Sequence, residues 1–289
     1  MRHILIVLLF SILFISCENQ KNDWSNLLDK DLSQWDKYLS YRHIDSYDGS
    51  IPVNDTGGVI APIGLNKDGY DVFTMNMTNN EPILTISGEI YGCIITKKEY
   101  KNYHLKLKVK WGNDVYPPRL TKGKDSGLLY HSFGEYGADH WRSWMFSHEF
   151  QVMKGRMGDY WTIGPTAMEI KAIPDEWIMN TIANENFSFL EIRDTTKGYG
   201  FCSRSADYES KEGEWTTLEL ICFEDKSLHI VNGEVVMILK NSSYFKDGKR
   251  LALEKGKIQI QCEAAEVFYK DIEITSLESL PAEYAKFYK

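Results

Sequence analysis

A carboxylate and an amide lie in the middle of an otherwise apolar segment, residues 146–153, with the sequence FSHEFQVM. In an extended strand, Glu149 and Gln151 would share one face, and His148 and Phe150 would share the other. An idle carboxylate among apolar residues is costly to bury, so Glu149 is the first candidate for a catalytic base or a metal ligand. Gln151 is a candidate for binding hydroxyl groups, and His148 is interpreted as a structural histidine. The alternative for Glu149 is a place on a solvated sheet face.

The same alternation returns near the C-terminus, in residues 257–263 with the sequence KIQIQCE. Gln259, Gln261 and Glu263 alternate with apolar residues, which predicts a second strand with one polar face. Two such strands side by side would give a sheet with one apolar face and one face rich in amides and carboxylates, which suits a sugar-binding groove. An antiparallel sheet with one face in water shows the same pattern, so the alternation alone decides nothing. Glu263 is a second catalytic candidate, and Gln259 and Gln261 are candidate substrate-binding amides.

A histidine and several aromatic residues complete the candidate site. His131 ends the segment 128–131 and is expected to share a face with Gly127 and Leu129. It could shuttle a proton, or it could bind a divalent metal ion together with Glu149, although no contiguous motif demands a metal. A hydrogen-bonded structural histidine is the alternative. The aromatic side chains that could serve either as flat platforms for a sugar or as ordinary packing are Trp141, Trp144, Tyr160 and Trp161.

The N-terminus predicts a bacterial lipoprotein. Arg2 and His3 precede an apolar run over residues 4–15 that is too short to span a bilayer, so residues 1–16 are interpreted as a signal peptide. Cys17 follows a small residue and is the expected site of lipidation, with residues 17–23 as a polar tether. The protein would then be anchored to the membrane in the cell envelope, on the periplasmic or the outer surface. An ordinary signal peptide with an incidental Cys17 is the alternative.

Charge and cysteine content limit the partners and the redox chemistry. The formal net charge is −8, and removal of the signal peptide makes it −9 because Arg2 leaves and no acid does. An acidic surface offers no electrostatic footprint for nucleic acid, which excludes that class of partner. Four cysteines beyond Cys17 permit one or two disulfides in an oxidising compartment. We expect two of them, Cys222 and Cys262, to be buried thiols.

Strand signals dominate the rest of the chain. The clearest is a hairpin in which Asn232-Gly233 supplies the two positive-φ residues of a type I′ turn. Helical patterns are confined to residues 25–38, which could equally form a turn and a short strand, and to residues 280–289. The composition does not change along the chain, so we expect one all-β domain over residues 24–277, with a tail at residues 278–289. Its longest loops are expected at residues 41–69 and 174–211.

Several short motifs resemble the 3-keto-disaccharide hydrolase domain family. They occur in the family's order along nearly the whole mature chain, and they include residues 24–28, 94–100, 110–112, 117–119, 124–131, 149–160, 229–233 and 256–274. The resemblance implies a concanavalin-A-like jelly-roll β-sandwich of two antiparallel sheets. It also implies that Lys110 and Lys124 bind substrate. For Asp125, which follows Lys124, we expect a structural role in an ion pair that fixes a loop.

The resemblance further implies cleavage of the glycosidic bond of 3-keto-glycosides and 3-keto-disaccharides. A ketone at C3 makes the hydrogen at C2 acidic, so the group at C1 can leave by elimination, after which water adds. Such a site needs a base, an acid and an electrophile at the ketone, and Glu149, His131 and Glu263 are the catalytic candidates. The alternatives are a non-catalytic carbohydrate-binding lipoprotein and a conventional glycoside hydrolase. A conventional hydrolase of this fold would need two carboxylates on one strand face, and the strand with Glu149 lacks the second one. Glu149 and Glu263 could still form a pair across strands.

Overall fold

The protein is described here from a computed structural model, which covers residues 24–67, 69–78, 81–139, 141–174, 176, 180–194 and 200–289. The predicted signal peptide, the lipidation site Cys17 and the tether lie outside these residues, so they stay predictions. Within the described ranges, no helix is both long enough and apolar enough to cross a bilayer.

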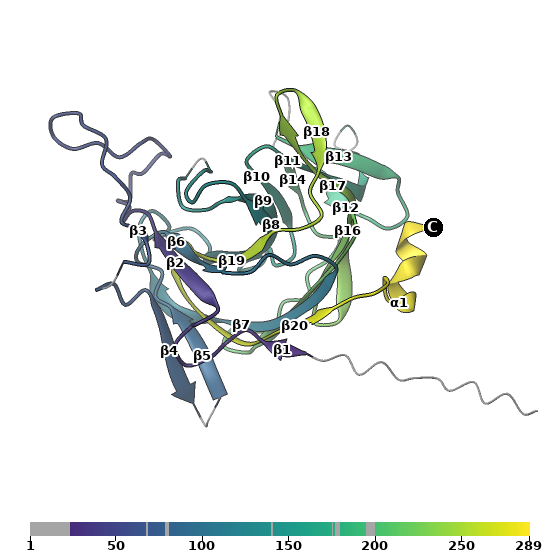
Figure 1. Ribbon diagram of the computed structural model, residues 1–289, viewed down its shortest axis with the longest axis horizontal. Helices are drawn as coiled ribbons and strands as arrows, with labels where there is room; N and C mark the ends of the chain where they lie inside the picture. The colour runs from purple at the N-terminus through teal and green to yellow at the C-terminus, as the bar shows by residue number, and fades with distance from the viewer. Residues whose placement is uncertain are drawn as a thin grey trace, which may run out of the picture.

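Two antiparallel sheets stack as curved layers, which confirms the predicted jelly-roll β-sandwich (Figure 1). The larger sheet has the strand order β12 (Ile182–Ala183), β11 (Thr166–Ile173), β17 (Glu234–Lys246), β16 (Lys226–Val231), β15 (Thr216–Phe223), β7 (Tyr103–Val115), β20 (Ala265–Ser276), β5 (Glu81–Ile86) and β4 (Phe73–Thr78). Three more strands pair with β20, β11 and β17 respectively: β1 (Ser25–Asn26), β13 (Phe189–Arg193) and β18 (Lys249–Ala252).

The smaller sheet carries the two segments with alternating polar residues. Its strand order is β14 (Phe201–Cys202), β10 (Tyr160–Ile163), β9 (Phe146–Met153), β8 (Asp125–Phe133), β19 (Lys257–Cys262), β6 (Gly92–Thr96), β2 (Trp35–Leu39) and β3 (Gly64–Leu65). Strand β8 lies between β9 and β19, so the two segments are separated by one strand only. This placement confirms that both contribute to one sheet.

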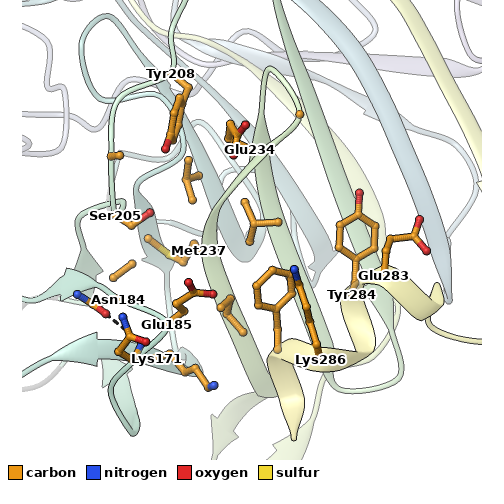
Figure 2. Close-up of a pocket in the computed structure, with 18 residues that line it drawn as sticks. Lys171, Asn184, Glu185, Ser205, Tyr208, Glu234, Met237, Glu283, Tyr284 and Lys286 are labelled. Atoms are coloured by element: carbon orange, nitrogen blue, oxygen red, sulfur yellow. Dashed lines mark hydrogen bonds between the residues drawn. The ribbon is translucent and has the colours of Figure 1, made fainter.

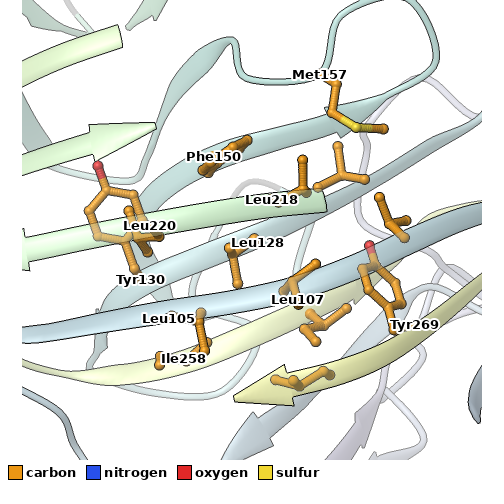
Figure 3. Close-up of a cluster of buried hydrophobic side chains, with 14 of the residues drawn as sticks. Leu105, Leu107, Leu128, Tyr130, Phe150, Met157, Leu218, Leu220, Ile258 and Tyr269 are labelled. Atoms are coloured by element: carbon orange, nitrogen blue, oxygen red, sulfur yellow. The ribbon is translucent and has the colours of Figure 1, made fainter. Parts of the chain in front are cut away.

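The core fills the space between the sheets and follows the two-residue period of the strands. Leu105 and Leu107 of β7 meet Leu128 of β8 and Phe150 of β9 across the interface, and all four are almost fully buried (Figure 3). Fully burying an aliphatic or aromatic side chain of this size contributes about 1.5–3 kcal/mol. The alternation therefore fixes which face of β8 and β9 turns away from the larger sheet.

Three histidines lie inside this core. His148 hydrogen-bonds through its two ring nitrogens to the Tyr160 hydroxyl and the Ser242 Oγ, both at 2.9 Å. His229 contacts the Tyr130 hydroxyl at 3.2 Å and the Gly158 carbonyl oxygen at 3.1 Å. Burial lowers the pKa of His131 to about 4 and that of His229 to about 3, and it lowers the pKa of His148 well below its usual range. All three are therefore neutral at pH 7, and the interpretation of His148 as structural is confirmed.

Local predictions have mixed outcomes. Asn232 and Gly233 have φ values of 50° and 86° between β16 and β17, as the hairpin prediction requires. Residues 25–38 form the turn and short strands rather than a helix, whereas the tail contains α1 (Ala282–Ala285) and a 3₁₀ turn, η2 (Lys286–Tyr288). The four cysteines at positions 93, 202, 222 and 262 are free and buried, so the permitted disulfides do not form among them.

The buried histidines predict loss of stability in acid. Each has a folded-state pKa below its unfolded value of about 6.5, so its contribution is complete above pH 6.5 and is lost as the pH falls toward the folded-state pKa. We expect each histidine to lower the free energy of unfolding by about 1.4 kcal/mol per pH unit in this window. Denaturant titrations at pH 7 and pH 5 measure the loss.

The variant His229→Phe keeps the ring that stacks on Phe150 at 4.3 Å and removes the titrating group. It should reduce the loss between pH 7 and pH 5 by about 2 kcal/mol. His104→Gln, on the outer face of β7 and only partly buried, is the control and should leave the loss due to the core histidines intact. An unchanged pH dependence in His229→Phe would contradict the assignment.

Candidate active site

A cavity of about 560 Å³ lies on the face of the smaller sheet that points away from the core. Phe150 and Tyr160 point into the core, so their strand neighbours Glu149 and Trp161 point the opposite way, into the cavity. The volume falls within the range of 300–1,000 Å³ that is usual for small-molecule sites. The polar residues that line it include Arg119, Asp125, Asp139, Glu149, Gln151, Gln261 and Glu263.

One guanidinium joins two carboxylates at one end of this cavity. Arg119 comes from the loop before β8, and its Nη2 lies 2.7 Å from the Glu263 Oε1, while its Nε donates to the same oxygen at 3.2 Å. Arg119 also forms an ion pair with Asp125, whose other oxygen accepts a hydrogen bond from the Gln151 side-chain amide. Asp125 and Glu263 are brought together because they face each other across an antiparallel bridge.

Glu149 and Gln261 meet above a glycine of the central strand β8. A Cβ atom on Gly127 would lie 2.3 Å from the Gln261 Oε1 and 2.5 Å from the Glu149 Oε1, so only glycine leaves room for both side chains. Glu149 is 4% exposed, and the Gln261 Oε1 is buried with no hydrogen-bond partner among the described residues. A buried acceptor of this kind is costly unless a ligand donates to it, which marks the position as a binding point.

Burial and neighbouring acids raise the pKa of two carboxyl groups, Glu149 and Asp125. Burial raises the pKa of Glu149 well above its usual range, and the nearby Glu263 and Asp125 raise it further. Burial and Glu263 also raise the pKa of Asp125, against the opposing effect of Arg119. Burial alone would lower the pKa of Arg119, but Glu263 and Asp125 raise it, so the guanidinium stays charged. The raised pKa favours the protonated form of Glu149, which is the form that can act as a general acid.

Aromatic side chains form the other end of the cavity. Trp141 and Trp144 lie in the loop between β8 and β9, and Asp139 holds this loop through three backbone N–H groups. Its Oδ1 accepts from Ser143 at 2.8 Å and Trp144 at 2.7 Å, and its Oδ2 accepts from Trp141 at 2.7 Å. Burial raises the pKa of Asp139 to about 6. Trp161 reaches the same end from β10.

The expectation that His131 shares a face with Gly127 and Leu129 is wrong. Tyr130 pairs with His148 and Phe133 with Phe146, so β8 has one more residue than β9 in this interval. This bulge, in which His131 has a φ of 52°, reverses the alternation and turns the imidazole into the core. His131 therefore does not line the cavity, as either a catalytic group or a metal ligand.

The predicted pair of metal ligands, His131 and Glu149, is accordingly not assembled. Among the described residues, no group of three or more histidine, cysteine, aspartate or glutamate side chains has a geometry that could hold a metal ion. In the cavity, the carboxylates of Asp125 and Glu263 are bound to Arg119 instead. The donor set therefore does not fit the predicted site.

Two further sequence expectations fail for reasons of packing. Tyr160 is fully buried in the core, because it alternates with Trp161 and the two cannot face the same side. Gln259 is on the correct face of β19 but supports the loop above it. Its Oε1 accepts a hydrogen bond from the Met145 backbone N–H at 3.0 Å, and its amide donates to the Ser132 Oγ at 2.8 Å. Gln259 therefore fixes the aromatic loop and does not line the cavity.

The two lysines are also outside the cavity. Lys110 belongs to β7 of the larger sheet, where its ammonium lies 5.0 Å from the Trp215 ring centre. Lys124 donates to the Gly112 carbonyl oxygen at 2.6 Å. The predicted ion pair of Asp125 does exist, but it lies inside the cavity. Among the other residues that line the cavity, the charged ones that were not predicted are Arg119, Asp139, Arg156 and Asp194.

Seven predicted site residues do line the cavity: Glu149, Gln151, Gln261, Glu263, Trp141, Trp144 and Trp161. Four of them come from the alternating segments, as the sequence pattern requires. Arg119 and Asp139 lie in loops, so periodicity could not find them. The motif Pro117-Pro118-Arg119, which is part of the family resemblance, was the only signal for Arg119.

A second cavity, of about 580 Å³, lies between β17, the loops at residues 184–186 and 205–208, and the C-terminal tail (Figure 2). Its charged residues are exposed or half-exposed, and its buried lining is apolar. Figure 2 shows Glu234, Glu283 and Lys286 at separate places around its rim. It therefore lacks the buried acids that give the first cavity its chemistry.

Comparison with known proteins identifies the family. The model of the 3-keto-alpha-glucoside-1,2-lyase-like domain matches residues 23–275, so the chain belongs to this family and to the carbohydrate-processing proteins. The resemblance seen in the sequence is thus confirmed. No curated protein matches the chain.

Solved structures show distant similarity. A glycosyl hydrolase candidate from Parabacteroides distasonis is 19% identical, with 89% of this chain and 100% of that chain covered and a TM-score of 0.44. A second candidate from the same organism is 17% identical, with coverages of 88% and 94% and a TM-score of 0.43. A carbohydrate-binding module from Bacillus subtilis is 9% identical, with coverages of 71% and 92% and a TM-score of 0.37.

The space above Gly127 yields a test of the site geometry. Gly127→Ala should displace the ends of the Glu149 and Gln261 side chains, and it should reduce turnover of the carbohydrate substrate at least tenfold. Its free energy of unfolding should change by less than about 1 kcal/mol, because the displaced atoms end flexible side chains. Gly112→Ala crowds the Glu266 carboxylate on the larger sheet and is the matched control, with turnover retained. Equal turnover in both variants would show that the meeting point is not functional.

Arg119 yields a test of the electrostatics. Arg119→Met would leave two buried carboxylates without their cation, which costs about 3–5 kcal/mol at pH 7. Part of this loss should be recovered at pH 5, where the acids can take up protons. Arg42→Met removes an exposed ion pair to Glu89 and should cost less than about 1 kcal/mol at both pH values. Chemical denaturation of the two variants measures both effects, and a small, pH-independent loss for Arg119→Met would refute the ion-pair assignment.

Proposed function

We propose that the protein cleaves the glycosidic bond of 3-keto-glycosides by acid and base elimination, followed by addition of water. The observation that carries this proposal is the meeting of Glu149, Arg119 and Glu263 in one cavity, where burial and the neighbouring acids raise the pKa of Glu149. The family description, which names a 3-keto-alpha-glucoside lyase-like domain, supports the substrate class.

Each group takes one role. The Glu263 carboxylate removes the proton from C2, and the electrons form the enolate at the C3 oxygen. The Arg119 guanidinium, which already lies between two carboxylates, stabilises that oxyanion. The bond from C1 to the leaving oxygen breaks, and Glu149 gives its proton to that oxygen. The products are an unsaturated keto sugar and an alcohol, and water then adds across the double bond.

A conventional double displacement is less suited to this arrangement. It needs one ionised carboxylate nucleophile and one acid flanking the bond, about 5–5.5 Å apart. Here the second acid, Glu263, is held by Arg119 through two nitrogens, which withdraws its charge from attack at C1.

We also propose that the protein is localised at the cell envelope. The predicted lipid at Cys17, on a short polar tether, would hold the enzyme at the envelope membrane, where glycosides enter from outside. Labelling with a fatty-acid probe tests this, with Cys17→Ser as the control that should lose the label.

Glu149→Gln tests the acid. Turnover of a 3-keto-glucoside should fall by about 10² to 10⁴, the usual contribution of a positioned acid. The free energy of unfolding should stay equal or rise, because the variant removes a buried acid. Glu169→Gln on β11, a half-exposed carboxylate beside Lys240, is the control and should keep full activity.

The same assay separates the functions. Release of the alcohol from a 3-keto-glucoside but not from the plain glucoside is the expected result. Release from the plain glucoside would instead identify a conventional glycosidase. Binding of both compounds without turnover would identify a carbohydrate-binding lipoprotein.

A further inference from the structure

The register of the strands orders the cavity from one end to the other. Asp125 pairs with Met153 and bridges to Glu263 at the acidic end, and four residues further along β8, Leu129 pairs with Glu149. At about 3.3 Å per residue, these two levels lie roughly 13 Å apart. The Glu149 carboxyl leans back over Gly127, so it lies between the acidic end and the next level.

Beyond Glu149, the lining contains aromatic side chains, together with Asp139, whose carboxyl is bound to the backbone of their loop. Trp161 pairs directly with Glu149 across β10 and β9, and its indole packs on the Phe201 ring with 4.5 Å between ring centres. The Trp141 indole packs against the Tyr47 ring, with 5.4 Å between ring centres. Both indoles are half-buried, so each is supported on one side and still lines the cavity.

The loop that carries Trp141 is fixed before any ligand binds. Asp139 accepts three of its backbone N–H groups, and Gln259 accepts a fourth, that of Met145. The Ser143 and Ser40 hydroxyls are hydrogen-bonded at 2.7 Å. A platform that is already ordered loses little conformational entropy on binding.

We propose that the Trp141 and Trp161 end is a leaving-group subsite that binds a planar, aromatic aglycone. This inference rests on the proposed function, because the acid Glu149 must stand between the sugar and the group that leaves. The keto sugar occupies the end with Arg119 and Glu263, and the aglycone extends past Glu149 onto the indoles. Aromatic rings stack on indoles in offset or edge-on geometry, which a compact methyl group cannot exploit.

The test compares methyl, cyclohexylmethyl and benzyl 3-keto-α-glucosides, whose alcohols have similar acidity. We expect kcat/KM for the benzyl compound to exceed that for the methyl compound about three- to tenfold, the range of one aromatic contact, with the cyclohexylmethyl compound between them. Trp161→Ala should bring kcat/KM for the benzyl compound down to the level of the methyl compound in the same variant. Trp161→Phe should restore most of the preference, and Trp215→Ala, beside Lys110 on the larger sheet, is the aromatic control.

Equal kcat/KM for all three compounds in the wild-type protein would overturn the subsite, as would a benzyl preference that survives in both Trp141→Ala and Trp161→Ala. Failure to cleave any of them would reject the proposed function instead. In that case, binding of the unoxidised benzyl and methyl α-glucosides to the same proteins decides the subsite. Tighter binding of the benzyl compound that is lost in Trp161→Ala supports it, and equal binding overturns it.

Discussion

The site depends on one guanidinium that is placed among three buried carboxyl groups. Arg119 contacts Asp125 and Glu263 directly, and Glu149 lies close enough for both acids to raise its pKa. One cation cannot balance three negative charges in a region from which water is largely excluded, so at least one acid must keep its proton. The burial of these groups on one sheet face therefore creates the proton donor, and no further group is needed to raise its pKa.

The smaller sheet makes this arrangement possible because one of its faces packs in the core and the other forms the cavity. Apolar side chains of β8, β9 and β19 fill the space against β7 and β15, and the alternate side chains of the same strands form the cavity. Rigid packing on one side thus fixes the positions of the acids on the other. The missing side chain at Gly127 and the loop held by Asp139 complete the site from the neighbouring strand and from above.

Sequence reasoning succeeded where strand periodicity decides the outcome. It placed Glu149, Gln151, Gln261 and Glu263 on one face because a strand has a period of two. It failed at His131 because a one-residue bulge reverses that period, and bulges leave little trace in a single sequence. Arg119 and Asp139 act from loops, where no period applies. The Tyr160 error was avoidable in principle, since Tyr160 and its neighbour Trp161 must point to opposite faces.

The most direct test of this account is the protonation state of Glu149, measured by carbon-13 NMR of its side-chain carboxyl in the intact protein. The account predicts a carboxyl that remains protonated at pH 7 and becomes easier to ionise when Glu263 is replaced by glutamine, because one neighbouring negative charge is then removed. A Glu149 signal that titrates near pH 4.5, unaffected by Glu263→Gln, would contradict it.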